Sequence, residues 1–263
     1  MRILQHFIVP VLSVVPNDRT VLPSHYFGTA FFINGDGVFL TARHVIEECE
    51  AEVASRGGEC GLGVCKPGDD SSLFFGKVIV REFAPPPYDI AIGIIDVPTR
   101  AAFVFGETQK LLVWDDVYTA GYPITAVHRD HGGSRIDARG HKGYVLRKVP
   151  QGHLLIHPHP DVIEVNFSIT KGLSGAPVVQ RDQRNVEGAS IDHFVLVGIC
   201  VNNEPAEIVD FRHTEVSEEG KEFSETTSRI EEYGIVHDLR PLADWKPACL
   251  GGITLRNAIV PNA

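Results

Sequence analysis

The sequence KGLSGAP at residues 171–177 places Ser174 between two glycines, directly before a run of apolar residues. Two earlier stretches, TARHV around His44 and YDIAI around Asp89, each adjoin an apolar run. A serine hydroxyl is a weak nucleophile at neutral pH and needs a histidine base, which a carboxylate orients. Unrelated hydrolase folds hold these three groups in different chain orders. The order histidine, aspartate, serine therefore informs on the fold as well as on the chemistry.

The composition is that of an ordinary globular chain with an acidic balance. The 263 residues, 43% hydrophobic and 22% charged, suffice for one large domain or for two lobes that share a site. The formal net charge is −10 and no basic cluster appears, so we expect neither nucleic acid nor a membrane surface as a partner. No run approaches the roughly 18 apolar residues of a membrane-spanning helix.

Cysteines and histidines give no metal signature. The five cysteines are an odd number, whereas a disulfide-bonded secreted protein more often has an even set. We therefore expect free thiols and a cytoplasmic location. Cys60 and Cys65 are spaced C-x4-C without a second pair, and His153, His157 and His159 lie in a proline-containing stretch. Neither group has the pattern of a zinc site, and we expect no metal and no cofactor.

Strand patterns dominate the chain. Residues 27–33 and 38–41 flank a glycine-rich turn and predict a hairpin. Residues 1–15 lack the charged region and the cleavage site of a signal peptide, so they predict a first strand. Helices are expected only at 45–55 and 238–246. The pattern predicts an all-β protein of antiparallel barrels or sandwiches rather than βαβ units. Further strands are expected at residues 77–80, 90–95, 117–120, 143–147, 153–156, 162–166, 176–179 and 194–200.

One segment differs from the rest in charge. Residues 204–232 hold ten acidic and three basic residues, a formal charge of −7 and most of the net charge of the chain. One hypothesis is a solvated surface loop whose charges repel one another. The other is a docking or gating element.

The three stretches resemble those of the trypsin-like serine peptidases, in particular the bacterial HtrA-like branch, over about residues 28–198. TARH resembles the histidine motif of that family, YDIA its aspartate motif, and GLSGAP its G-x-S-G-x-P nucleophile loop. AGYP at 120–123 and VGI at 197–199 resemble a turn of the second barrel and the strand that borders the substrate. The resemblance implies the chymotrypsin fold, with two six-stranded antiparallel β-barrels and the triad in the cleft between them.

The resemblance also implies a division of the chain. Residues 1–105 would form the N-terminal barrel and carry His44 and Asp89. Residues 106–263 would form the C-terminal barrel, with Ser174, the acidic insertion and a C-terminal helix. About 30 residues follow Tyr233, too few for a PDZ-like domain.

Each candidate site residue has an expected role. His44 is the expected base, Asp89 its orienting carboxylate and Ser174 the nucleophile. The glycine at 172 lets the N–H groups of Gly172 and Ser174 converge on an oxyanion. Leu173 occupies the place where secreted trypsins have an acidic residue, so activation through a freed N-terminus is not expected.

Two assignments rest on fewer observations. Asp69 or Asp70 could take the role given to the aspartate of YDIAI. By the resemblance, Ser168 lies at the floor of the pocket for the residue before the scissile bond, and this small, uncharged residue predicts a preference for uncharged side chains there. A preference for Arg or Lys would instead point to a carboxylate from residues 204–232. The rest of the pocket is expected at Val201, Asn202 and Asn203.

The leading hypothesis is therefore a serine endopeptidase that cleaves proteins or peptides through an acyl-enzyme. It is either active on its own or latent until an activating protein engages it. The alternative is a catalytically silent peptidase fold that acts as a binding or scaffold module.

Overall fold

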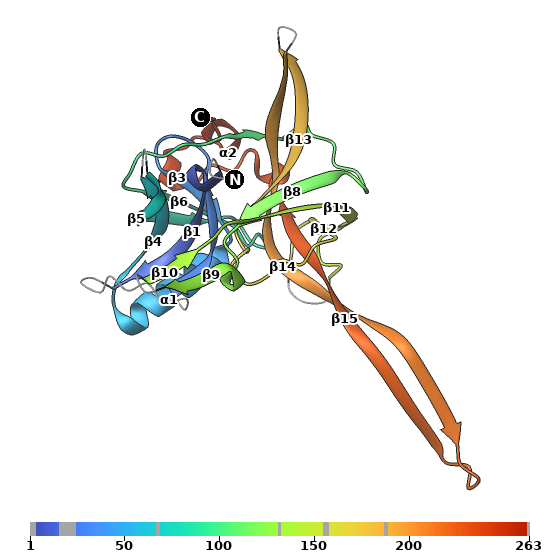
Figure 1. Cartoon of the computed structure of the whole chain (residues 1–263). Coiled ribbons are helices and arrows are strands. Elements are labelled where there is room, and N and C mark those ends of the chain that lie inside the picture. Colours follow the sequence, from blue (N-terminus) through green and yellow to red (C-terminus); the bar gives the residue numbers. More distant parts are fainter. Residues whose placement is uncertain are drawn as a thin grey trace.

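The computed structural model describes residues 4–15, 25–66, 69–130, 133–154, 158–186 and 189–261, leaving out the side chains at 66–72, 129–134 and 183–192. No helix within these ranges is long and apolar enough to cross a membrane. Two sheets hold most of the chain (Figure 1).

The first sheet is a closed barrel in the order β1-β2-β3-β6-β5-β4, and all neighbouring strands are antiparallel. Its strands are apolar on both faces: the pair Phe31 and Leu40 and the pair Phe32 and Phe39 have no exposed surface. Because successive strand residues point to opposite faces, only one of these two pairs faces the barrel interior, and the other packs outside it. The strands are β1 (Ile8–Val14), β2 (Tyr26–Phe32), β3 (Val38–Thr41), β4 (Glu59–Lys66), β5 (Asp69–Phe83) and β6 (Ala91–Ile95).

The predicted hairpin between residues 27 and 41 is confirmed as β2 and β3, which pair antiparallel. The Asn34 side chain holds the turn, because its Oδ1 accepts from the N–H groups of Asp36 and Val38. Gly37 has a φ of +79°, a conformation that favours glycine.

The second sheet also closes into a ring. Six strands follow in the order β13-β8-β11-β12-β15-β14, and β13 pairs with β14 as well. The predicted pair of six-stranded antiparallel barrels is therefore confirmed. A seventh strand, β7, adds to β14 in parallel, so the expected boundary after residue 105 separates β7 from the sheet in which it pairs. The strands are β7 (Phe103–Phe105), β8 (Asp116–Gly121), β11 (Arg139–Val149), β12 (Val162–Val165), β13 (Pro177–Val186), β14 (Ala189–Val216) and β15 (Glu222–Asp238).

The remaining elements are short. The expected helix after the histidine is confirmed as α1 (Arg43–Arg56). A separate two-stranded ribbon, β9 (Val127–Asp130) and β10 (Gly133–Ile136), follows β8 in the chain. A four-residue helix, α2 (Leu255–Ala258), lies near the C-terminus, and 3₁₀ turns occupy Leu4–His6, Ile124–Ala126 and Ala248–Leu250.

Two predicted elements need correction. The C-terminal helix expected at residues 238–246 is wrong, because β15 continues to Asp238 and only a 3₁₀ turn, Arg240–Leu242, follows. Pro247 disfavours the helical conformation for the residue before it, so it does not favour a helix that reaches residue 246. The strand expected at 153–156 is absent at residues 153–154, and the rest of it lies outside the described residues.

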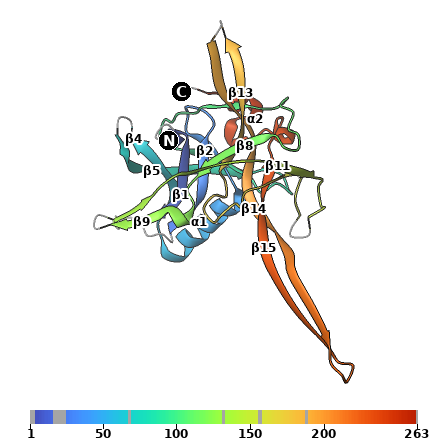
Figure 2. The ribbon, with the colours of Figure 1, turned by 45° about the vertical axis from the view of Figure 1, so that its right-hand side comes forward.

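The acidic segment is a hairpin rather than a loop. Beyond the barrel, β14 and β15 stay paired from Asn203 and Gly234 out to Val216 and Glu222. Figures 1 and 2 show this pair projecting far from the two barrels, and we call residues 204–232 the arm. A shorter hairpin of β13 and β14 projects on the opposite side of the molecule.

Candidate functional site

Strand pairing brings the histidine and the aspartate together. Thr41 at the end of β3 pairs with Ala91 at the start of β6. His44 follows that end of β3, and Asp89 precedes that start of β6. His44 Nδ1 lies 2.6 Å from Asp89 Oδ2, and the backbone N–H of His44 donates to Asp89 Oδ1 at 2.9 Å. The carboxylate is thus fixed by two bonds and selects the His44 tautomer that leaves Nε2 as the base.

The two groups shift each other's titration. Burial lowers the pKa of His44, but the hydrogen bond and the charge of Asp89 outweigh burial and raise this pKa above its ordinary value. Burial raises the pKa of Asp89, but the bonds from His44 prevail and lower it. The pair is therefore suited to hold a proton on the imidazole. The side chains of Asp69 and Asp70, the alternatives for this role, lie outside the described residues.

A second histidine, His237 on β15, also contacts Asp89 and was missed in the sequence. The backbone N–H of Asp89 donates to His237 Nδ1 at 3.1 Å, so neutral His237 carries its proton on Nε2. Its ring lies edge-on to Tyr88 and is 4% exposed. Burial lowers the pKa of His237 to about 4; the charge of Asp89 opposes this shift, and His159 and His44 add to it. His237 is therefore a neutral acceptor at physiological pH.

The nucleophile candidate lies against the strand that leads into the arm. The hydroxyl of Ser174 donates to Val201 O at 3.3 Å, and among the described residues it makes no hydrogen bond to His44. Val201 is the extra residue of a bulge in the β14–β15 ladder. Bulges redirect backbone groups and are common beside active sites. Hydrogen bonds of catalytic groups are often formed only with substrate, so this geometry is compatible with a nucleophile at rest.

The loop before the serine presents two backbone donors. Leu173 N donates to Thr170 O at 2.8 Å, and Gly172 at the third turn position has a φ of +94°, which is typical of a type II turn. Lys171 O accepts from Ile124 N at 2.9 Å. Since the peptide is planar and trans, the N–H of the next residue points the opposite way. Among the described residues, the N–H groups at 172 and 174 have no protein partner, as an oxyanion site requires.

Thr29 on β2, for which the sequence analysis predicted no role, joins this loop to the first barrel. Its Oγ1 donates to Gly172 O at 2.7 Å and accepts from Tyr122 N at 2.9 Å. Its N–H donates to Ser174 O at 2.9 Å. A Cβ at Gly175, where φ is +86°, would overlap Thr29 O. The loop is therefore positioned by contacts between the two barrels.

The residues expected to form the substrate pocket do not all lie together. Ser168 and Asn203 are in contact, whereas Asn202 is exposed and accepts from Asn203 N through its side chain. The arm adds a carboxylate: Ser168 Oγ donates to Glu232 Oε2 at 2.8 Å, and Asn203 Nδ2 lies 3.0 Å from the same oxygen. An exposed carboxylate of the arm therefore lies beside Ser168, the residue from which a preference for uncharged side chains is predicted.

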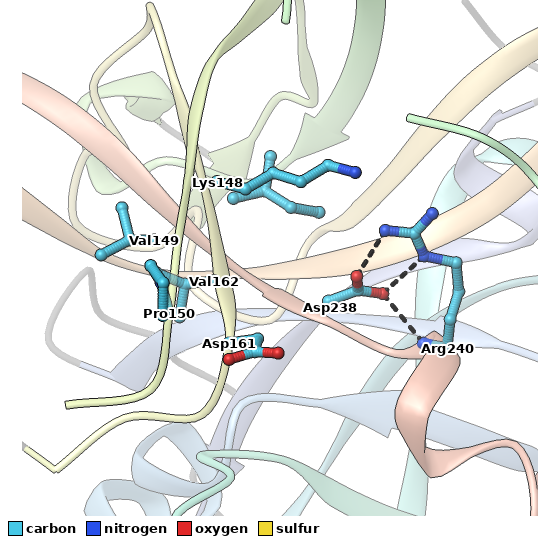
Figure 3. Close-up of a pocket in the computed structure, with 8 residues that line it drawn as sticks. Lys148, Val149, Pro150, Asp161, Val162, Asp238 and Arg240 are labelled. Carbon is cyan, nitrogen blue, oxygen red and sulfur yellow. Dashed lines mark hydrogen bonds and ion pairs between the residues drawn. The ribbon is translucent and has the colours of Figure 1, made fainter. Parts of the chain in front are cut away.

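A separate cavity of about 270 Å³ lies between β11, β12 and β15 (Figure 3). Arg240 lines this cavity, and its guanidinium is already bonded, because Nε and Nη2 donate to Asp238. The backbone N of Arg240 donates to Asp238 as well. Lys148 and Asp161 complete its charged lining, and none of the candidate site residues lines it. Within the described residues no group of three metal-ligating side chains occurs.

Comparisons with known proteins agree with this geometry. A family model of the trypsin-like peptidase domain matches residues 28–188. A protein of Bartonella henselae named "Probable periplasmic serine endoprotease DegP-like" is 26% identical over 168 residues, which are 62% of this chain and 28% of that protein. This chain therefore spans well under half of the curated relative.

Solved structures are also similar to this chain. The apo MamO protease domain from Magnetospirillum magneticum matches with a TM-score of 0.50 and 14% identity, over 90% of this chain and 94% of that one. The crystal structure of Deg5 matches with a TM-score of 0.49 and 15% identity, over 75% and 80% of the two chains. The family match covers more than half of the sequence and includes His44, Asp89 and Ser174. The chain therefore belongs to the trypsin-like peptidase domain family.

Proposed function

We propose that the chain is a serine endopeptidase that hydrolyses protein peptide bonds through an acyl-enzyme on Ser174. The observation that carries the proposal is the 2.6 Å bond between His44 Nδ1 and Asp89 Oδ2. It holds the imidazole in the tautomer whose Nε2 can accept a proton from a serine hydroxyl. The raised pKa of His44 agrees with an imidazolium stabilised by the carboxylate.

The proposed reaction has two halves. Ser174 Oγ leaves Val201 O, attacks the scissile carbonyl and transfers its proton to His44 Nε2. The N–H groups of Gly172 and Ser174 stabilise the oxyanion. The C–N bond breaks, the imidazolium donates its proton to the leaving amine, and water then cleaves the acyl ester with the same base.

Hydrolysis of an unstructured protein tests this proposal. We expect the parent chain to cleave casein, either alone or, if the gate proposed below holds, only with cell extract added, and Ser174→Ala to leave casein intact in the same condition. Ser228→Ala, an exposed serine of the arm, is the matched control and is expected to cleave like the parent. Equal cleavage by parent and Ser174→Ala would reject the role of Ser174.

We further propose that a partner protein gates the site. The support is that Ser174 donates to Val201 O, and that Val201 lies on the strand that continues into the acidic arm. A fluorophosphonate label that reacts with serine nucleophiles tests the gate. Labelling that requires added cell extract supports gating, and full labelling of the isolated chain rejects it. Absence of Ser174-dependent labelling in both conditions would favour the silent scaffold.

We also propose a cytoplasmic location, which the free thiols of Cys49, Cys60, Cys200 and Cys249 support. Fractionation of cells that express the tagged chain tests it. Recovery outside the cytoplasm would reject it.

A further inference from the structure

The base of the arm forms a polar cluster close to the nucleophile. Val201 O contacts Ser174 Oγ, and Asn203 lies two residues further along β14. At the rise of an extended strand, Asn203 lies about 7 Å along β14 from Val201. The side chain of Asn203 crosses to Ile169, accepting from its N–H at 2.6 Å and lying 3.1 Å from its carbonyl oxygen. A substrate side chain directed from Ser174 along β14 toward Asn203 would reach this cluster.

The cluster has too few hydrogens for its acceptors. Asn203 Nδ2 carries two hydrogens but lies within 3.1 Å of three acceptors, which are Ser168 Oγ, Ile169 O and Glu232 Oε2. Ser168 uses its single hydrogen on Glu232 Oε2. The other carboxylate oxygen, Oε1, receives no donor from the described residues. An added group that carries several N–H donors would satisfy the cluster.

The charges around Glu232 also favour the binding of a cationic group. The described residues give Glu232 no cationic partner, whereas the neighbouring Glu231 is paired with Arg229 at 3.0 Å. The arm as a whole adds a formal charge of −7. A planar guanidinium or an ammonium on a long stem supplies both the donors and the missing charge.

We infer that Glu232, with Ser168 and Asn203, forms a subsite for the cationic side chain of an Arg or Lys residue of the substrate. The inference rests on the proposed peptidase function and names its substrate class. It replaces the preference for uncharged side chains that Ser168 alone predicts.

Two peptides that differ only in charge test the subsite. One carries arginine before the bond to be cut, and the other carries citrulline, its neutral isostere. We expect the parent to cleave the arginine peptide with a kcat/KM about 10-fold higher or more, and Glu232→Gln to cleave the two almost equally. Glu225→Gln removes the same charge far out on the arm and is expected to keep the preference. Equal cleavage of both peptides by the parent would overturn the inference while leaving the peptidase proposal intact.

Binding of benzamidine, a small amidinium, tests the subsite without any cleavage. Calorimetry is expected to show binding to the parent and to Glu225→Gln, and at least 10-fold weaker binding to Glu232→Gln. Glu232-dependent binding by a chain that cleaves no peptide, with or without added cell extract, would support the subsite and reject the peptidase proposal. Binding that is absent, or that does not change in Glu232→Gln, would overturn the subsite.

Discussion

The two halves of β14 both pair with β15 but differ in sequence and in environment. In the barrel, Ile199 and Cys200 have no exposed surface, and Val201 is 4% exposed. In the arm, Phe211 and Val216 are 54% and 65% exposed, although the pairing with β15 continues without a break in direction. Backbone pairing alone therefore extends a strand, but only the barrel half is fixed by packing. The candidate site lies where the two halves meet.

The largest expected effect is a loss of activity when His44, in the packed part of the molecule, is replaced. His44→Ala removes the base, and we expect kcat/KM on a cleaved peptide to fall about 10⁴-fold, because histidine and serine act as one unit. The melting temperature should stay close to that of the parent, since His44 is partly exposed. Glu225→Gln in the arm is the control and should retain full activity. Substantial cleavage by His44→Ala would remove His44 from the mechanism.

Two isoleucines of β15 compare the halves directly. Ile235 is 4% exposed in the barrel, and Ile230 is 71% exposed in the arm. Ile235→Ala should lower the free energy of unfolding by about 2–5 kcal/mol, because it leaves a cavity. Ile230→Ala should change it by about 0.5 kcal/mol or less. Urea unfolding measures both, and equal losses would contradict the division of β14 and β15 into packed and unpacked halves.

His237 makes the packed half sensitive to acid. Because its pKa is about 4 in the folded chain and near 6.5 when unfolded, the unfolded state binds more protons between these values. The contribution of neutral His237 to the free energy of unfolding is thus fully present above about pH 6.5. It is lost as the pH decreases, and the loss reaches about 3 kcal/mol near pH 4.

His237→Asn tests this pH-dependent contribution, because the side-chain oxygen of asparagine can accept from Asp89 N but does not titrate. Unfolding free energies measured from pH 7 to pH 4 should decline less steeply in the variant. Parallel curves for parent and variant would show that His237 is not the acid-sensitive group.

Thr29→Val removes a hydroxyl that links the two barrels. Gly172 O and Tyr122 N would each lose a buried partner, at a cost of about 1–3 kcal/mol in unfolding free energy. Since the same bonds position the oxyanion loop, kcat should fall more than KM rises. Thr29→Ser keeps the hydroxyl and should restore both values. A variant with reduced stability but unchanged kcat would limit Thr29 to a structural role.

The smallest effect on stability is expected in the arm. Replacing residues 207–228 with a short Gly-Ser turn removes exposed pairs and should leave the melting temperature nearly unchanged. If the arm guides partners to the cleft, activity or binding should change at low salt and approach the parent value at high salt, where charges are screened over about 10 Å or less. Identical behaviour at both salt concentrations would make the arm a passive surface element.

The sequence predicted the features that local motifs encode. The alternation of short strands predicted antiparallel barrels or sandwiches. The resemblance of the three motif stretches to those of the trypsin-like peptidases implied the two barrels and the pairing of His44 with Asp89. They could not reveal partners that depend on distant strand register. His237 meets Asp89 across 148 residues, and Glu232 meets Ser168 across 64. Glu232 looked like one charge among ten in the acidic stretch, and only the register of β14 with β15 singles it out.

The central claim is that Ser174 is a nucleophile activated by His44. Reaction of the parent with diisopropyl fluorophosphate, followed by mass spectrometry of the digested protein, tests it most directly. The account predicts one adduct per chain, on the peptide that contains Ser174, and none in His44→Ala. If gating holds, the adduct forms only with the activating extract present. An adduct on another residue, an equal yield in His44→Ala, or no adduct in either condition would contradict the claim.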